Sequence, residues 1–274
     1  MKQKIINGVL NFDENSMEYI RFGTGGKILI LLPGLGDGLH TVKGMALPMA
    51  VLYRAFAKEY TIYSFSRMER IPQGHSTRDM AGDLKRAMDM LGIEKADIIG
   101  VSMGGMIAQH LAADYPEAVG KLVLVVTVPR QNPVISGAVS KWIEMAERGD
   151  HRALMESNLE LIYSEKYYRK NRRLIPIIAA ITKPKSYERF LRQAQACLTH
   201  NSLESLQNIK APTLIIGGGK DETVGSEGSL ELHSMIDNSL LRIYPNGPHG
   251  LYEEEDDFQI YVLSFLKYKN NNEV

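Results

Sequence analysis

The residues best suited to chemistry in this sequence lie in the segment Gly-Val-Ser-Met-Gly at positions 100–104. A short apolar run precedes the serine as a buried strand would, and apolar side chains at helical spacing follow it. A tight turn between a strand and a helix strains the serine backbone, so the positions two before and two after the serine have almost no room for a side chain. Here these positions are Gly100 and Gly104. The pattern predicts that Ser102 is a nucleophile and that the backbone N–H of Met103 faces the group it attacks.

A serine hydroxyl is a poor nucleophile near neutral pH, so it needs a base that takes its proton. In an α/β sheet that carries such a serine, the acid and then the histidine follow it in the chain. Of the seven histidines, only His233 and His249 lie late enough. His233 falls in a helical pattern, whereas His249 lies in the turn Pro-Asn-Gly-Pro-His-Gly, just after a strand-like run. We therefore predict His249 as the base.

The carboxylate that orients the base should also follow a strand. Asp221 comes a few residues after the apolar run at 213–217, and Glu222 is its immediate competitor. The shorter side chain and the position favour Asp221. The strand-like run before it, at 121–128, leads into Thr-Val-Pro-Arg-Gln-Asn at 127–132, which lacks a carboxylate at the commonest alternative place.

Negative charge that develops on a substrate oxygen is stabilised by fixed backbone N–H donors. The glycine-rich segment 31–38, Leu-Leu-Pro-Gly-Leu-Gly-Asp-Gly, follows a strand-like run. We predict that the N–H of Leu35 acts there as the partner of the N–H of Met103 in an oxyanion hole. The alternative is a flexible glycine loop without a role.

These groups come from distant segments, so strands and helices must bring them together. Short apolar runs alternate with helical stretches, which predicts an α/β fold with a mostly parallel sheet covered on both faces. One helix is expected to begin at a cap formed by Ser76 or Thr77 and to end at Gly92, and the last helix to begin within 253–257. The strand-like runs lie at 17–22, 27–32, 60–65, 97–101, 121–128, 213–217 and 240–244.

One region, 129–203, shows no strand pattern, and its composition shifts to long helical residues, tyrosines and cations. We interpret it as an inserted helical cap, or lid, on a core formed by residues 1–128 and 204–274. Its apolar side chains either line the roof of a pocket or pack in the cap's own core; they are Trp142, Ile143, Met145, Met155, Leu159, Leu161, Ile162 and Tyr163.

The charges of the whole chain balance, with 32 basic and 32 acidic residues. No net field therefore draws nucleic acid or an anionic membrane, and we expect a small-molecule substrate. Cations do gather in the predicted cap, where they attract a carboxylate-bearing substrate or form a solvated face. They are Lys166, Arg169, Lys170, Arg172, Arg173, Lys183, Lys185, Arg189 and Arg192.

Other features narrow the expected class. The first residues lack the apolar stretch of a secretory signal and no run approaches a membrane span, so we expect a cytoplasmic protein. The single cysteine, Cys197, rules out an internal disulfide and is expected to pack as a small hydrophobe. Because no histidine pair has metal-ligand spacing and Gly-Gly-Gly-Lys at 217–220 is not a phosphate-binding loop, we predict neither metal nor cofactor. The oligomeric state is left open.

With these motifs the chain resembles the α/β-hydrolase superfamily, including its esterase, lactonase and proline iminopeptidase-like members. The likeness is carried by Leu-Leu-Pro-Gly-Leu-Gly, Gly-Val-Ser-Met-Gly-Gly, Tyr-Pro-Glu-Ala-Val, Pro-Thr-Leu-Ile-Ile-Gly-Gly-Gly-Lys-Asp and Gly-Pro-His-Gly. The resemblance implies that nucleophile, acid and base are Ser102, Asp221 and His249. Two departures stand out, because Pro33 replaces a frequent histidine and the loop after 60–65 lacks the family's usual Asp-x-Arg-Gly-x-Gly pattern.

The leading functional expectation is a capped serine hydrolase, similar to carboxylesterases, that cleaves a small ester, lactone or thioester through an acyl-enzyme. Alternatives on the same triad are an aminopeptidase acting at an N-terminal proline, a carbon–carbon bond hydrolase and a perhydrolase. A ligand-binding or signalling protein that keeps the hydrolase fold is a further alternative. The serine argues against the haloalkane dehalogenase branch, which has aspartate at that place.

Overall fold

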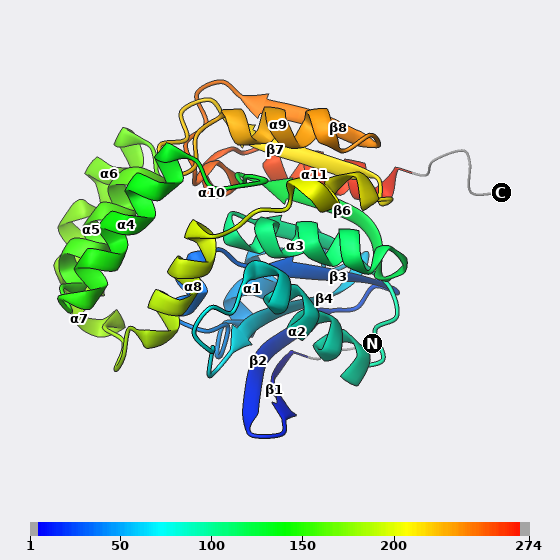
Figure 1. Ribbon diagram of the computed structural model, residues 1–274, viewed down its shortest axis with the longest axis horizontal. Coiled ribbons are helices and arrows are strands. Elements are labelled where there is room, and N and C mark those ends of the chain that lie inside the picture. The colour runs from blue at the N-terminus through cyan, green and yellow to red at the C-terminus, as the bar shows by residue number, and fades with distance from the viewer. Residues whose placement is uncertain (1–4, 269–274) are drawn as a thin grey trace.

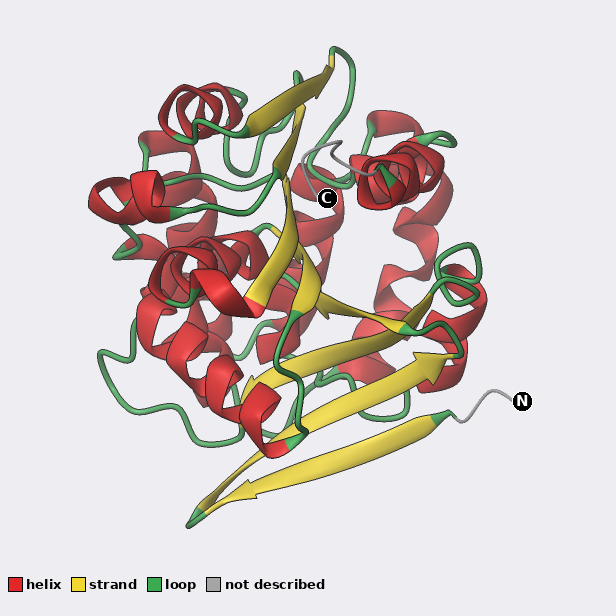
Figure 2. Cartoon of the chain, turned by 90° about the vertical axis from the view of Figure 1, so that its right-hand side faces the viewer, coloured by secondary structure: helices red, strands yellow, loops and turns green. Residues whose placement is uncertain are grey.

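The computed structural model describes residues 5–268, and within them the strands form one eight-stranded sheet (Figures 1 and 2). The strand order is β1-β2-β4-β3-β5-β6-β7-β8, with β1, β2 and β4 paired antiparallel and the remaining neighbours parallel. The predicted mostly parallel sheet is confirmed. The strands are β1 (Ile6–Phe12), β2 (Asn15–Gly23), β3 (Lys27–Leu32), β4 (Tyr60–Met68), β5 (Ala96–Val101), β6 (Val119–Val125), β7 (Thr213–Gly218) and β8 (Ser239–Tyr244).

Every strand-like run of the sequence contributes to a strand, but β1 was not predicted. It forms a hairpin with β2 through a short turn in which Asp13 has a φ of 48°. Only Leu10 and Phe12 of β1 are buried, because it is an edge strand, and this leaves a weak apolar pattern. The run at 121–128 also ends earlier than expected. Val126 has a φ of 45°, so the chain leaves the strand there.

Helices cover both faces of the sheet, as Figure 2 shows. The apolar cluster on one face includes residues of α2 (Thr77–Met90), α3 (Met103–Asp114) and α9 (Glu227–Met235), and the other includes residues of α1 (Ala46–Leu52) and α11 (Phe258–Lys267). Ser76 caps α2 as expected, and Gly92 with a φ of 66° follows its end. The predicted last helix is split into α10 (Leu251–Glu254) and α11.

The chain passes from β6 to β7 through a helical insertion at one end of the molecule (Figure 1). Its ends meet where Arg130 and Asn201 form an isolated antiparallel bridge. Asn132, Asp150 and Ser164 accept backbone N–H groups as caps of its helices. The division into core and cap stays a prediction. The helices are α4 (Pro133–Glu147), α5 (His151–Ile162), α6 (Glu165–Asn171), α7 (Ile175–Thr182) and α8 (Glu188–Leu198), with the 3₁₀ turn η3 (Arg172–Leu174) before α7.

A buried histidine pair lies where the insertion returns to the core. The imidazole of His200 contacts Thr77 Oγ1 through Nδ1 at 2.8 Å, and the ring of His110 lies edge-on to it with 5.3 Å between centroids. Within residues 5–268, His200 Nε2 and His110 Nδ1 have no hydrogen-bond partner. Burial lowers the pKa of His200 to about 3 and also lowers the pKa of His110.

The substitution His200→Gln is expected to reduce the acid sensitivity of the fold. The unfolded chain binds a proton at this imidazole below about pH 6.5, whereas the folded protein does so only near pH 3. The free energy of unfolding therefore falls as the pH drops from 6.5 towards 3, by at most about 1.4 kcal/mol per pH unit for one proton. Urea unfolding between pH 7 and 4 measures this slope, with His233→Gln at an exposed position of α9 as control. Equal slopes for His200→Gln and the wild-type protein would contradict the assignment.

Candidate active site

Ser102 occupies the turn between β5 and α3 with φ 52° and ψ −119°, which is strained for a residue with a Cβ. The turn leaves no room beside it. A Cβ on Gly100 would lie 2.6 Å from the carbonyl oxygen of Gly104, and one on Gly104 would overlap the carbonyl oxygen of Leu32. The Oγ1 of Thr127 donates to the carbonyl oxygen of Ser102 at 2.8 Å and helps to hold this conformation. The two predicted glycines therefore permit the strained turn.

His249 and Asp221 meet in the loops that follow β8 and β7. His249 Nδ1 lies 2.8 Å from Asp221 Oδ2, and the two residues are only 4% and 7% exposed. Asp221 Oδ1 accepts the backbone N–H groups of Thr223 and Val224, both at 2.9 Å, so the carboxylate is held from both sides. Glu222, the alternative acid, is exposed.

The other candidate base, His233, lies on the exposed side of α9, where its Nδ1 contacts Ser239 Oγ at 2.8 Å. Ser102 and His249 instead line one cavity of about 430 Å³. The structure shows no hydrogen bond between the side chains of Ser102 and His249. Catalytic hydrogen bonds are often long without substrate and shorten in the reactive complex.

Two helix N-termini meet beside Ser102. Leu35 is the first residue of the 3₁₀ turn η1 (Leu35–Gly38), and Met103 is the first residue of α3. Neither backbone N–H has an acceptor in the described part of the chain, as is usual for the first turn of a helix. A Cβ on Gly34 would lie 3.4 Å from the Cβ of Ser102, so this loop approaches the serine closely. The unpaired N–H groups suit stabilisation of an oxyanion.

The wall of the cavity combines α1, the insertion and the loop at 33–38, called the oxyanion loop after its predicted role. Of the apolar cap residues considered from the sequence, Trp142, Ile162 and Tyr163 line it, whereas Ile143, Met145, Met155, Leu159 and Leu161 do not. Sequence reasoning missed several lining residues, although two methionines of the α1 region at i, i+4 spacing were a usable signal. The missed residues include His40, Thr41, Met45, Met49, Asn158 and Tyr252.

The cavity lining carries little charge. No Lys or Arg lies among its described residues, so none of the nine cap cations contacts this space. The lining includes the acidic residue Asp37. The Asp37 carboxylate forms an ion pair with Arg189 of α8, with 2.6 Å between Oδ2 and Nη2. Arg189 also donates to the backbone carbonyl oxygens of Asp37 and Arg67, and Gln193 donates to the same Oδ2 at 3.3 Å. The insertion thus binds the turn that begins at Leu35.

The insertion also binds the loops after β7 and β8, through the corner between α5 and α6. Thr223 Oγ1 donates to the carbonyl oxygen of Leu161 at 3.0 Å. The backbone N–H of Gly250 donates to the carbonyl oxygen of Ile162. A Cβ on Gly250 would lie 2.7 Å from the ring of Tyr163, so a side chain would disturb this contact. All three loops of the candidate site are therefore held by the inserted helices.

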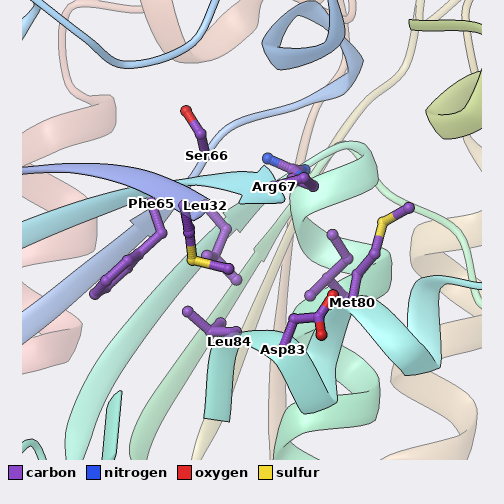
Figure 3. A pocket seen from close by; sticks show the side chains of 9 residues that line it. Leu32, Phe65, Ser66, Arg67, Met80, Asp83 and Leu84 are labelled. Carbon is purple, nitrogen blue, oxygen red and sulfur yellow. The ribbon is translucent and has the colours of Figure 1, made fainter. Parts of the chain in front are cut away.

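A smaller cavity lies between β4 and α2 (Figure 3). Its volume of about 20 Å³ holds about one water molecule, so it is not a substrate site. Cys197 is buried, and burial raises the pKa of its thiol to about 12, which keeps it unreactive. Within residues 5–268 no cluster of three metal-ligating side chains is found, and no helix has the length and apolar character to cross a bilayer.

The strand-turn-helix serine and the acid–histidine pair at the carboxyl edge of a mostly parallel sheet define a hydrolase-type α/β protein. Residues 27–256 match the model of the alpha/beta hydrolase fold family. The chain belongs to this family. One relative is the 2-hydroxy-6-oxononadienedioate/2-hydroxy-6-oxononatrienedioate hydrolase 2 of Pseudomonas putida, 26% identical over 277 residues that cover 92% of each chain. This relative and the others reported with it are named as hydrolases, and the protein is an enzyme of the α/β-hydrolase family.

Solved structures show the same fold. The alpha/beta hydrolase enzyme MGS-M2 from a Medee basin deep-sea metagenome library has a TM-score of 0.83 and 24% identity, covering 97% of this chain and 100% of its own. The enol-lactonase from Burkholderia xenovorans LB400 has a TM-score of 0.80 and 20% identity, covering 95% of this chain and 100% of its own. Together with the family match over residues 27–256, these structures confirm the predicted α/β-hydrolase resemblance.

Proposed function

We propose that the protein is a serine hydrolase that cleaves a small, uncharged ester, lactone or thioester through an acyl-enzyme. The observation that carries the proposal is that Ser102 and His249, from distant loops, border one cavity, and that Asp221, from a third loop, contacts His249 at 2.8 Å. The unpaired N–H groups of Leu35 and Met103 beside the serine add the donors that acyl transfer requires.

In this reaction Ser102 Oγ attacks the substrate carbonyl carbon while His249 Nε2 takes the hydroxyl proton. Asp221 accepts the Nδ1–H of His249 and so holds the tautomer that leaves Nε2 free to act as a base. Leu35 and Met103 stabilise the oxyanion, and His249 then gives the proton to the leaving oxygen or sulfur. Water, activated by the same imidazole, hydrolyses the acyl-enzyme and restores Ser102.

The chemistry of the cavity wall favours an uncharged substrate. The Pseudomonas putida relative is named for substrates that are dioates, which carry two carboxylates. The described lining here offers no Lys or Arg to pair with such a group, and burying an unpaired carboxylate is costly. Carbon–carbon bond hydrolysis remains the second candidate, on the strength of that relative. An aminopeptidase needs a free carboxylate for the substrate's ammonium, whereas Asp37 is already bound by Arg189.

A matched substrate pair tests the proposal. The p-nitrophenyl monoester of glutarate differs from p-nitrophenyl butyrate mainly by a carboxylate at the end of the acyl chain. We expect kcat/KM for the butyrate ester to be about tenfold or more higher than for the glutarate ester. A short lactone, a short acyl-thioester and a 2-hydroxy-6-oxo-dienoate complete the panel. A preference for the glutarate ester, or turnover of the dienoate alone, would contradict the proposal.

Loss of the clamp between the insertion and the oxyanion loop should impair catalysis. We expect Arg189→Met to lower kcat about 10- to 100-fold with little change in KM, because the N–H of Leu35 loses its fixed position. Arg189→Lys keeps the charge but loses the planar fork of donors, so an intermediate kcat is expected. Steady-state kinetics on the preferred ester measures both variants.

The matched control for this clamp is Arg192→Met on the same helix, since Arg192 binds Glu188 of α8 rather than the oxyanion loop. We also expect slower labelling of Ser102 by an organophosphonate in Arg189→Met. A variant that loses thermal stability but keeps its kcat and its labelling rate when folded would show that Arg189 acts on the fold alone.

A further inference from the structure

Helix α7 is apolar on two opposite sides. Ile175 and Ala179 are buried, where the helix packs on α5. A second apolar stripe faces solvent and consists of Leu174, Ile177, Ile178 and Ile181, of which Ile177 and Ile181 are 60% and 78% exposed. A surface helix normally presents polar residues on its outer side, so this exposed stripe needs a partner. Figure 1 places α7 at the outer edge of the insertion.

Unpaired cations flank the stripe. Arg172 and Arg173 precede it and Lys183 and Lys185 follow it, and all four are exposed. Their charged groups form no hydrogen bond or ion pair with other residues in the described part of the chain. Residues 165–185 carry seven cations and one acid, a net charge of +6 in a chain whose total is zero. The zero net charge of the chain therefore conceals a strongly positive region.

We propose that this cationic–apolar face, formed by Arg172, Arg173, Leu174, Ile177, Ile178, Ile181, Lys183 and Lys185, docks on the surface of an anionic lipid bilayer. A helix lying in the plane of the interface buries an apolar stripe at the boundary of headgroups and acyl chains, while flanking cations pair with lipid phosphates. A symmetric contact with a second copy of the chain brings the same patch against itself and sets cations against cations. Charge complementarity thus favours the lipid surface as the occupant.

The docking face lies one helix away from the cavity. α5, against which α7 packs, contributes Asn158 and Ile162 to the cavity wall. A bilayer bound at α7 would therefore bring the roof of the cavity close to the membrane surface. The proposal is independent of the serine mechanism, because it needs only the exposed residues of η3, α7 and the loop after it.

Sedimentation of the full-length protein with large unilamellar vesicles tests the docking. We expect binding to vesicles of equal parts phosphatidylglycerol and phosphatidylcholine, weak binding to phosphatidylcholine alone, and partial loss of binding as NaCl is raised. The double variants Ile177→Ser/Ile181→Ser and Arg172→Gln/Arg173→Gln should each weaken binding to the anionic vesicles about tenfold or more.

Matched controls come from α1 and the residues after it. Leu47 and Val51 are 62% and 61% exposed, so Leu47→Ser/Val51→Ser removes equally exposed apolar residues at another place. Arg54→Gln/Lys58→Gln removes two exposed cations away from the docking face. Both control variants should bind anionic vesicles as the wild-type protein does. Ser102→Ala should also bind normally, which separates this proposal from the proposed reaction.

Three results would overturn the proposal. One is equal binding to anionic and zwitterionic vesicles, and another is unchanged binding of both α7 variants while their thermal unfolding shows an intact fold. The third is a dimer in size-exclusion chromatography that Ile177→Ser/Ile181→Ser dissociates, combined with no vesicle binding by the wild-type protein. That result would assign the face to contact between two copies of the chain.

Discussion

Replacing Ser102 with alanine is expected to lower kcat on the preferred ester by about 10⁵-fold or more, since removal of a triad serine costs about 2 × 10⁶ in another hydrolase. Alanine keeps the Cβ, so the backbone strain at φ 52° is unchanged and the fold should persist. An organophosphonate should label the wild-type protein once per chain at Ser102, and the adduct should be missing from the variant. Steady-state kinetics and mass spectrometry measure these two results.

Ser234→Ala is the matched control for this substitution, because Ser234 lies at an exposed position of α9, away from the cavity. It should keep both activity and labelling. Substantial residual activity in folded Ser102→Ala protein would show that the nucleophile is another group, and the proposed acyl-enzyme would then be wrong.

Asp221→Asn should lower kcat about 10⁴-fold with little change in KM, by analogy with a protease triad. The two N–H groups of Thr223 and Val224 bind Oδ1 of residue 221, so the asparagine would keep its oxygen on that side. Its NH₂ group would then face Nδ1 of His249 and donate to it. The imidazole would carry its proton on Nε2, where it cannot accept the proton of Ser102.

Glu222→Gln is the control for the acid, since Glu222 is the exposed neighbour of Asp221. Its kcat should stay near that of the wild-type enzyme. A large loss in Glu222→Gln together with near-normal turnover in Asp221→Asn would assign the acid to Glu222 instead. The pair of variants therefore decides between the two carboxylates that the sequence leaves in competition.

Much of the sheet could be predicted because its signals are local. A buried strand, a glycine-flanked turn and an amphipathic helix each depend on neighbouring residues, so β5, Ser102 and α3 could be placed from sequence. The edge strand β1 was missed because few of its residues are buried. Its pairing with β2 is decided by a contact between strands, which periodicity in one strand does not reveal.

The candidate site divides in the same way. Chain order and turn chemistry were enough to place Asp221 and His249 after two late strands, and the structure brings them within hydrogen-bonding distance. The contact between Arg189 and Asp37 could not be predicted, because it joins residues about 150 positions apart across the boundary of the insertion. The sequence identified Arg189 only as one of nine cap cations, and its partner becomes apparent only in three dimensions.

The hydrogen bonds that tie the α5–α6 corner and Arg189 to the loops of the candidate site should restrict how substrate enters and product leaves. If the insertion swung away as a rigid body, the loops of the proposed acid, base and oxyanion hole would lose their supports together. Admission of substrate is therefore expected through local rearrangement of the wall, where Met45 and Met49 have unbranched, adaptable side chains. Rotamer changes of exposed side chains take picoseconds to nanoseconds, whereas collective movement of a whole domain takes microseconds to milliseconds, so admission through the wall should be the faster route.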